Sequence, residues 1–207
     1  LMRQAQSVKK GVRANGGTPR EFCTITVTDG IAMGHEGMKS SLISREIIAD
    51  STELTVRGHC YDALVGIAGC DKSLPALMMA MVRLNVPSVF IYGGSILPGR
   101  YKGKDVTVVD VFEAVGKHSA GKMSTKELRK LELVACPSAG ACGGQFTANT
   151  MACVSEAIGL ALPYSAGTPA PYEERDKYAK ESGKVVMNLL AKGIKPRDIV
   201  TIKSLEN

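Results

Sequence analysis

The stretch "DALVGIAGCDKSLPALMMAMVRLNVPSVFIYGG", residues Asp62–Gly94, decides the fold of this chain. It opens with a short apolar run closed by glycine, as expected for a strand buried on both faces of a parallel sheet. The segment "LPALMMAMVRLNV" is typical of a helix, with Pro75 tolerated in its first turn, and "PSVFIYGG" is a second buried apolar run. Strand, helix and strand in this order predict a βαβ unit with a right-handed crossover.

Upstream, the segment "EFCTITVTDG", residues 21–30, alternates in the way of a β-strand. Cys23, Ile25, Val27 and Asp29 fall on one face, and the predicted strand ends at Asp29 and Gly30. Helical spacing precedes it in residues 1–16 and follows it in residues 36–55. These segments predict a second βαβ unit and therefore a sheet of three parallel strands.

The second half of the chain is mostly helical by pattern, over residues 108–121, 124–135, 147–163 and 172–193. Ser124 followed by Glu127 is a capping-box signature at the start of one of these helices. Residues 163–171 form the best loop or hinge. The predicted fold class is α/β, a three-layer α/β/α arrangement with a mainly parallel sheet and a helix-rich second half.

Composition and charge exclude several functional classes. The net charge of the 207 residues is +6, but basic and acidic residues are interleaved, and with 5% aromatic residues and no Trp there is little material for base stacking. We therefore expect no nucleic-acid partner. No apolar run approaches the roughly 18 to 20 residues that a bilayer requires, so we expect no membrane association. Six cysteines are too sparse for a secreted disulfide scaffold, which favours a reducing compartment.

Reactive residue types follow each of the three predicted strands. Asp29 ends the first, Cys70, Asp71 and Lys72 follow the second, and the run Gly93–Ser95 follows the third. In open parallel sheets ligands bind outside the carboxyl ends of the strands, so we expect these residues to meet at one edge. The glycines could cradle a phosphate, but no strand is followed by a dinucleotide or P-loop fingerprint, which disfavours a nucleotide-binding fold.

The acids and the lysine allow more than one role. Asp29 and Asp71 suit a hard divalent cation such as magnesium, although Asp29 could instead cap its turn. Lys72 would ordinarily be their counter-ion, but a partly desolvated lysine can be a neutral amine that acts as a base or is modified.

Cysteines provide the second set of possible ligands. Cys142 lies in the glycine-rich loop of "CPSAGACGGQFTANTM", ahead of a helix whose N-terminus favours a thiolate. Its spacing from Cys136 does not fit the short pairs of zinc sites. Cys70 and Cys142 could hold an iron–sulfur cluster only if the fold brings them together and a third thiolate joins them. Cys23 and Cys153 are interpreted as packing residues, and for Cys60 and Cys136 packing and ligation stay equally open.

Four stretches together resemble the family of dihydroxy-acid and sugar-acid dehydratases. They are "TVTDGIAMGHEGMKSSLISREIIADS", "GIAGCDKSLPALM", "IYGGSILPGRY" and "CPSAGACGGQFTANTMA", and the resemblance runs over nearly the whole chain. The longer segment "GGSILPGRYKGKDVTVVDVFEAVG" favours the branched-chain member over the sugar-acid members.

The resemblance implies a hydro-lyase that dehydrates 2,3-dihydroxy-3-methyl carboxylic acids of the 2,3-dihydroxyisovalerate type to 2-keto acids, in valine, isoleucine and leucine biosynthesis. It implies an iron–sulfur cluster, with [2Fe–2S] favoured, and Mg²⁺. By the same resemblance Cys70 and Cys142 bind the cluster, Asp29 and Asp71 bind magnesium, and Lys72 is the lysine found carboxylated in the family.

The resemblance also makes residues 1–207 the amino-terminal, cluster- and magnesium-binding domain of a larger two-domain enzyme. The first cluster cysteine would precede Leu1, and the general base and a further magnesium ligand would belong to a C-terminal domain, so this segment alone is predicted to be inactive. A homodimer is implied, in the cytoplasm of a bacterium or in the mitochondrion or chloroplast of a eukaryote. The alternatives are an aldonate dehydratase of the same family and a non-enzymatic iron–sulfur module.

Overall fold

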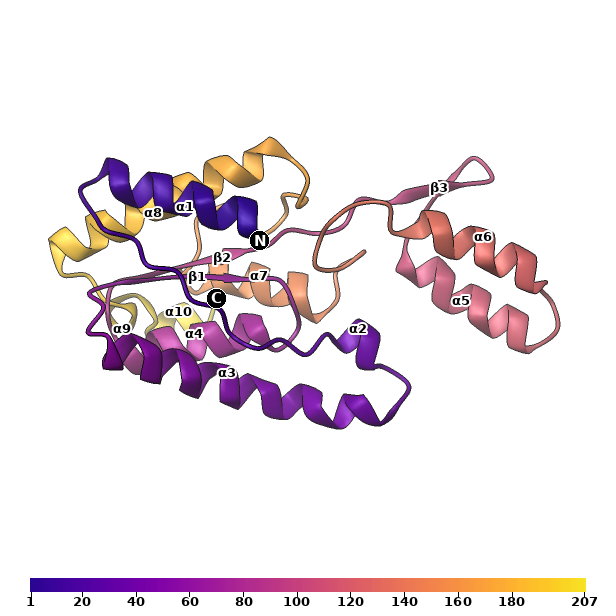
Figure 1. Cartoon of the computed structure of the whole chain (residues 1–207), viewed down its shortest axis with the longest axis horizontal. Helices are drawn as coiled ribbons and strands as arrows, with labels where there is room; N and C mark the ends of the chain where they lie inside the picture. Colours follow the sequence, from indigo (N-terminus) through magenta and orange to yellow (C-terminus); the bar gives the residue numbers. More distant parts are fainter.

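The computed structural model describes residues 1–207, folded into a layered body from which a smaller arm projects (Figure 1). The helices of the body are α1 Met2–Ala14, α2 Asp29–Ala32, α3 Lys39–Gly58, α4 Ser73–Leu84, α7 Thr147–Ala157, α8 Glu173–Lys192, α9 Pro196–Ile199 and α10 Ile202–Leu205, with a 3-10 turn, η1, at Glu36–Met38. Its strands are β1 Leu64–Ala68 and β2 Ser88–Tyr92. The arm consists of β3 Gly99–Tyr101, β4 Lys104–Val106, α5 Val108–Ser119 and α6 Thr125–Ala135.

The predicted βαβ unit of residues 62–94 is confirmed. β1 and β2 pair in parallel, in a register that runs from Leu64 opposite Ser88 to Ala68 opposite Tyr92, and α4 connects them. All five residues of β2 are buried, as the continuous apolar run predicted. On its other edge β2 makes one parallel bridge, from Phe90 to Ala161.

Helices cover both faces of this small sheet, which confirms the three-layer α/β/α class (Figure 1). On one face α1 and α8 pack against β2 through six buried residues, which are Val8, Val12, Val89, Ile91, Ala179 and Val186. On the other face α4 and α7 pack on the sheet, and α3 lies outside α4, with Ile48 and Ala49 buried against Ala76. None of the helices combines the length and apolarity that a bilayer-spanning segment needs.

Two glycines set the distance between α1 and α8. A Cβ atom on Gly11 would lie 2.0 Å from the carbonyl oxygen of Lys180, and one on Gly183 would lie 2.3 Å from that of Val8. Both positions therefore require glycine for the two helix backbones to approach so closely.

The strand predicted over residues 21–30 is wrong. Residues 17–28 have no regular hydrogen-bonded structure, and Asp29 begins the short helix α2 instead. No backbone hydrogen bond joins this segment to β1, and both line a cavity of about 1200 Å³. The β-branched, alternating pattern predicts an extended chain correctly, but a strand also needs a neighbouring backbone within hydrogen-bonding distance.

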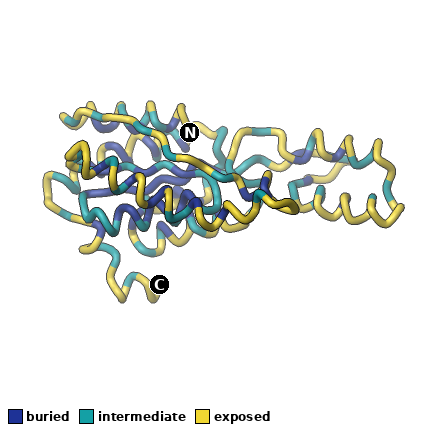
Figure 2. The backbone as a smooth tube through the Cα atoms, turned by 60° about the horizontal axis from the view of Figure 1, so that its bottom comes forward, coloured by how far each residue is buried: buried dark blue, intermediate teal, exposed yellow.

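The arm has a small core of its own, and most of its remaining surface is exposed (Figure 2). That core consists of four buried apolar residues, which are Val106, Ala114, Leu131 and Ala135. The predicted helices of residues 108–121 and 124–135 are present, and Ser124 accepts the backbone N–H of Glu127 as the capping signature indicated. The β3–β4 hairpin was not predicted. Its two-residue turn, Lys102–Gly103, has positive φ at both positions, as type I′ turns require.

The C-terminal part of the body differs from the sequence-based expectation in its details. The helix expected over residues 147–163 ends at Ala157, because Gly159 turns the chain at φ +83°. The helix α8 closely matches its predicted range. The short helices α9 and α10 had no counterpart in the sequence pattern.

Candidate metal and cofactor site

The turn between β1 and α4 carries three of the predicted site residues in a row. Cys70 follows the end of β1 by two residues, and its carbonyl oxygen accepts the N–H groups of Ser73 and Leu74, which start α4. The hydroxyl of Ser73 also faces the backbone N–H of Cys70, at 3.2 Å. This turn therefore fixes the backbone from which Cys70, Asp71 and Lys72 project.

Asp29 reaches this turn from α2. Its side chain is buried, and its two oxygens have different partners: Ser41 Oγ donates to Oδ1 across 2.6 Å, and Lys72 Nζ donates to Oδ2 across 2.8 Å. Lys72 Nζ also lies 3.6 Å from Asp71 Oδ2. The structure thus brings Asp29, Asp71 and Lys72 together and places Lys72 in the position of a counter-ion.

The pKa values of the two carboxyl groups are shifted in opposite directions. Burial pulls the pKa of Asp29 up, but hydrogen bonds with Lys72, Ser41 and Asp71 outweigh it and hold that pKa below its ordinary value. For Asp71, burial and then the hydrogen-bonded Asp29 raise the pKa. Asp29 is therefore the ionised member of the pair, and Asp71 is the one that more readily holds a proton.

The structure places Cys142 near Cys70 and Asp71, although they are distant in the sequence. Burial raises the pKa of the Cys142 thiol, and the negative charges of Asp71 and Cys70 raise it further. Hydrogen bonding from the backbone N–H groups of Gly143 and Gly144 acts in the opposite direction and favours the thiolate. Both cysteines are half-buried and unpaired. A soft metal centre with other ligands would favour the two thiolates.

The glycine run after β2 supports the Cys142 loop. The carbonyl oxygen of Gly94 accepts the N–H of Ala141 across 2.8 Å, and the N–H of Ile96 donates to the carbonyl oxygen of Cys142 across 2.8 Å. Gly94 has φ +98°, and a Cβ there would lie 2.6 Å from the backbone of Ala170. These groups are used within the protein, so the run connects the two loops and is not an open phosphate cradle.

Tyr92 and Arg175 form a buried polar layer at the end of β2. The Arg175 guanidinium donates to the carbonyl oxygens of Tyr92, at 2.9 Å, and Thr168. The Tyr92 hydroxyl is buried and makes no well-formed hydrogen bond, although the nearby Asn149 side chain acts to lower its pKa. Burial, followed by the charge of Cys142, raises the pKa of Tyr92 to about 12.

The other cysteines lie outside this cluster. Cys23 and Cys153 are exposed, so the prediction that they are packing residues is wrong. Cys23 lies in the segment that forms no strand, and Cys153 lies on the outer side of α7, whose buried positions are Ala148, Ala152 and Ser155. Cys60 and Cys136 are also exposed.

The donor set can be tested against the two groups that the sequence resemblance implied. Two carboxylates beside one lysine suit a hard cation, and two half-buried thiols suit a soft iron centre, so the donor chemistry fits both groups in kind. The set is incomplete in number, because no group of three or more His, Cys, Asp or Glu side chains in the structure could hold a metal ion. Further ligands would therefore have to join these residues.

Two hydrogen-bonding residues of the site were not predicted. Ser41, in α3, donates to Asp29, and Thr147, at the start of α7, interacts with Asp71 in a way that lowers its pKa. Hydroxyl residues are common and carry no spacing signal of their own, so no sequence pattern singles these two out. The large cavity beside β1 includes Cys70 in its lining but none of Asp29, Asp71 and Lys72.

Comparisons with known proteins agree with the sequence resemblance. The family model described as "Dihydroxy-acid/6-phosphogluconate dehydratase N-terminal" matches residues 1–207. The chain is 95% identical to a dihydroxy-acid dehydratase of Pelagibacter ubique and 81% identical to one of Parvibaculum lavamentivorans, in each case over all of this chain and 36% of the relative. It is 54% identical to a dihydroxy-acid dehydratase of Metallosphaera sedula, over 37% of that protein. The chain thus spans little more than a third of the length of these relatives.

Proposed function

The chain belongs to the dihydroxy-acid/6-phosphogluconate dehydratase N-terminal family, and on that premise we propose that the protein carrying it is a dehydratase acting on 2,3-dihydroxy-3-methyl carboxylic acids of the 2,3-dihydroxyisovalerate type. The reaction removes the hydroxyl of C3 and the proton of C2 as water, and the resulting enol becomes a 2-keto acid. Such a reaction would belong to the biosynthesis of branched-chain amino acids. Identity of 95% to a protein named dihydroxy-acid dehydratase supports this substrate over an aldonate.

One observation in the structure carries the proposal: the turn after β1 separates two kinds of ligand at adjacent positions. Cys70 and the nearby Cys142 provide soft sulfur, and Asp71 with Asp29 provides hard oxygen. Cys70 and Cys142 would hold the iron–sulfur cluster, and Asp29 and Asp71 would hold Mg²⁺. When bound, the cluster would supply a Lewis acid for the C3 hydroxyl, and magnesium a positive charge for the substrate carboxylate.

The residues of this chain would bind the metal groups, and their surroundings would set which of the ligands are ionised. Asp29 stays ionised because Lys72 and Ser41 donate to it, so it is a ready cation ligand. Asp71 would lose its proton when a cation arrives, because the positive charge outweighs the effect of Asp29. The N–H groups of Gly143 and Gly144 favour Cys142 as a thiolate, the form that binds metal.

Lys72 would change its role when it is carboxylated. A neutral amine adds carbon dioxide and releases one proton, which replaces the ammonium with a carbamate anion. The Lys72 ammonium beside Asp29 and Asp71 would then be replaced by a carbamate, which is a third oxygen ligand. This ligand would add to the two carboxylates, which are too few to hold a metal ion by themselves. Native mass spectrometry of the intact protein should show a mass higher by one carbon dioxide, and this added mass should be absent in Lys72→Met.

We also propose that residues 1–207 are the amino-terminal domain of a two-domain enzyme, because the family model that matches them is described as N-terminal and they cover 36% of the relatives. The remaining part would supply the general base and the missing ligands. Residues 1–207 produced alone should then show no turnover, even with iron, sulfide and magnesium. A cytoplasmic location in a bacterium stays a prediction.

The test of function is a substrate panel on the full-length protein. Keto-acid formation from 2,3-dihydroxyisovalerate should exceed that from gluconate and arabinonate. Preference for either sugar acid would favour the aldonate alternative. Redox cycling of a bound cluster without any keto acid from the three substrates would favour the non-enzymatic iron–sulfur module.

A further inference from the structure

Arg175 carries a buried charge that no acid neutralises. Its side chain is 0% exposed, and the hydrogen bonds of its guanidinium go to backbone carbonyl oxygens rather than to a carboxylate. Glu156 is near enough for its charge to act on Arg175, but its oxygens accept the backbone N–H groups of Tyr164 and Ala166. A buried charge is costly unless another charge offsets it. The guanidinium therefore has no carboxylate of its own in this chain.

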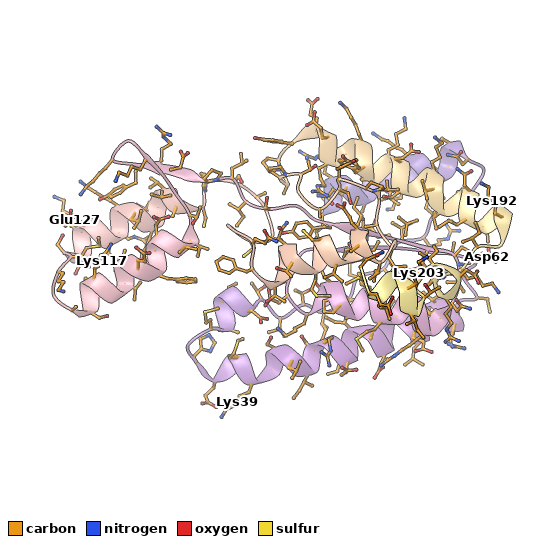
Figure 3. The ribbon with its side chains drawn as sticks, turned by 180° about the vertical axis from the view of Figure 1, so that it is seen from behind. Lys39, Asp62, Lys117, Glu127, Lys192 and Lys203 are labelled. Carbon is orange, nitrogen blue, oxygen red and sulfur yellow. The ribbon has the colours of Figure 1, made fainter.

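This guanidinium lies at the carboxyl end of β2. Figure 3 shows Lys192 at the end of α8 that is far from the arm, and Arg175 belongs to the first turn, at the opposite end of the helix. It donates to the carbonyl oxygens of Tyr92, the last residue of β2, and of Thr168. Its central carbon lies 5.8 Å from the centre of the Tyr92 ring, and its Nε has no partner. Arg175 thus contacts both the backbone and the ring of Tyr92.

Tyr92 connects this charge to the two cysteine loops. The strands β1 and β2 end side by side, and Cys70 follows β1 by two residues. Beyond Tyr92, the carbonyl oxygen of Gly94 accepts the N–H of the residue that precedes Cys142. The buried Tyr92 hydroxyl makes no well-formed hydrogen bond, and the charges of both Cys142 and Arg175 act on it. Tyr92 is therefore within electrostatic reach of the guanidinium and of the Cys142 sulfur.

We propose that Arg175 and Tyr92 form a positively polarised layer behind the two cysteines, which offsets the negative charge of an iron–sulfur cluster bound there. The guanidinium would contribute its charge, and the hydroxyl would contribute its O–H dipole. Burial raises the pKa of Tyr92 to about 12, so the hydroxyl keeps its proton at neutral pH. Charges and hydrogen bonds near the sulfur atoms set the reduction potential of such a cluster. The inference rests on the proposed cluster but not on the proposed substrate.

The reduction potential of the cluster in the full-length protein tests the role of the charge. Arg175→Gln keeps an amide donor but removes the charge, so it should lower the equilibrium constant for one-electron reduction about ten-fold, or about 60 mV. Arg175→Lys keeps the charge and should leave the constant close to that of the unsubstituted protein. Optical titration with dithionite measures both.

Arg3→Gln is the matched control for this measurement. Arg3 donates to the carbonyl oxygen of Ala170, in the loop that Arg175 also contacts, but its side chain is 54% exposed and is paired with Asp176. Its removal should therefore leave the constant unchanged, because solvent and Asp176 already screen its charge.

Tyr92→Phe removes only the hydroxyl and should lower the same constant about three-fold, or about 30 mV. An unchanged constant in Arg175→Gln, with native circular dichroism and full visible absorption, would refute the proposal. Where Arg175→Gln does not fold, an unchanged constant in Tyr92→Phe would refute it. An equal decrease in Arg3→Gln would also refute it, because an exposed charge would then act as strongly as the buried one. A full-length protein that binds no iron would refute the proposed cluster together with this layer.

Discussion

Lys72 donates to Asp29 across 2.8 Å, and this single contact joins residues 43 positions apart in the sequence. It connects the start of α2 to the turn that begins α4, beside a second acid, Asp71. The lysine side chain is 19% exposed and that of Asp29 is 7% exposed, so solvent screens the contact only partly. The same atoms therefore contribute to the stability of the body and to the candidate cation site.

We predict that Lys72→Met destabilises the protein by about 1.5–3 kcal/mol at neutral pH, the usual value of a hydrogen bond to a charged group. The substitution leaves Asp29 buried beside Asp71 without a cation. Urea unfolding followed by circular dichroism measures the loss. Combining Lys72→Met with Asp71→Asn should recover part of it, because one of the two like charges is removed. No recovery in the double variant would mean that repulsion between the acids is not the cause.

In the full-length protein, Cys70→Ser and Cys142→Ser should each abolish most of the visible absorption and bound iron that we expect of an iron–sulfur centre, because a hydroxyl is a poor ligand for iron. Cys153→Ser is the control, since Cys153 is exposed on α7 and lies outside the cluster. Absorption and iron content that match the unsubstituted protein would remove the residue concerned from the ligand set.

Tyr92→Phe should leave stability at neutral pH unchanged or raise it by about 1–3 kcal/mol, because it removes a buried hydroxyl that makes no well-formed hydrogen bond. The pKa of Tyr92 in the folded protein is raised from 10.0 to about 12. Between pH 10 and pH 12 the Tyr92 hydroxyl loses its proton in the unfolded chain but keeps it in the folded protein. The contribution of the protonated hydroxyl to the free energy of unfolding is therefore fully present below pH 10 and is lost as the pH rises to 12.

The stability gap between Tyr92→Phe and the unsubstituted protein should therefore widen by about 1 kcal/mol from about pH 8 to about pH 11. Urea unfolding of both proteins at the two pH values measures it. A gap that stays constant would mean that Tyr92 ionises alike in the folded and unfolded states.

Gly11→Ala should destabilise the protein by about 1–3 kcal/mol, the usual cost of overpacking. The new methyl group would meet the Lys180 carbonyl at 2.0 Å, so α1 and α8 would have to separate. Gly58→Ala, at the end of α3, is the matched control, because a Cβ there meets nothing within 4 Å. It should be neutral or stabilising by about 0.4–1 kcal/mol. Thermal unfolding of the two variants compares them, and equal effects would contradict the close approach of the helices.

The sequence by itself determined the local parts of this protein. The βαβ unit of residues 62–94 follows from apolar runs, helical spacing and the positions of Gly69 and Pro75, all of which act between near neighbours. The chemical types at the end of β1 could be named for the same reason, since Cys70, Asp71 and Lys72 are consecutive. The helices α5, α6 and α8 were also found from their periodicity.

Only the tertiary structure decided which distant groups meet. It placed Asp29 on Lys72 and Cys142 near Cys70, and it added Ser41, which no spacing rule would have selected. It also left residues 17–28 without a strand partner. The physical reason is that periodicity records which side of an element is apolar, whereas hydrogen bonds, ion pairs and ligand sets depend on the packing of elements that are far apart in the chain.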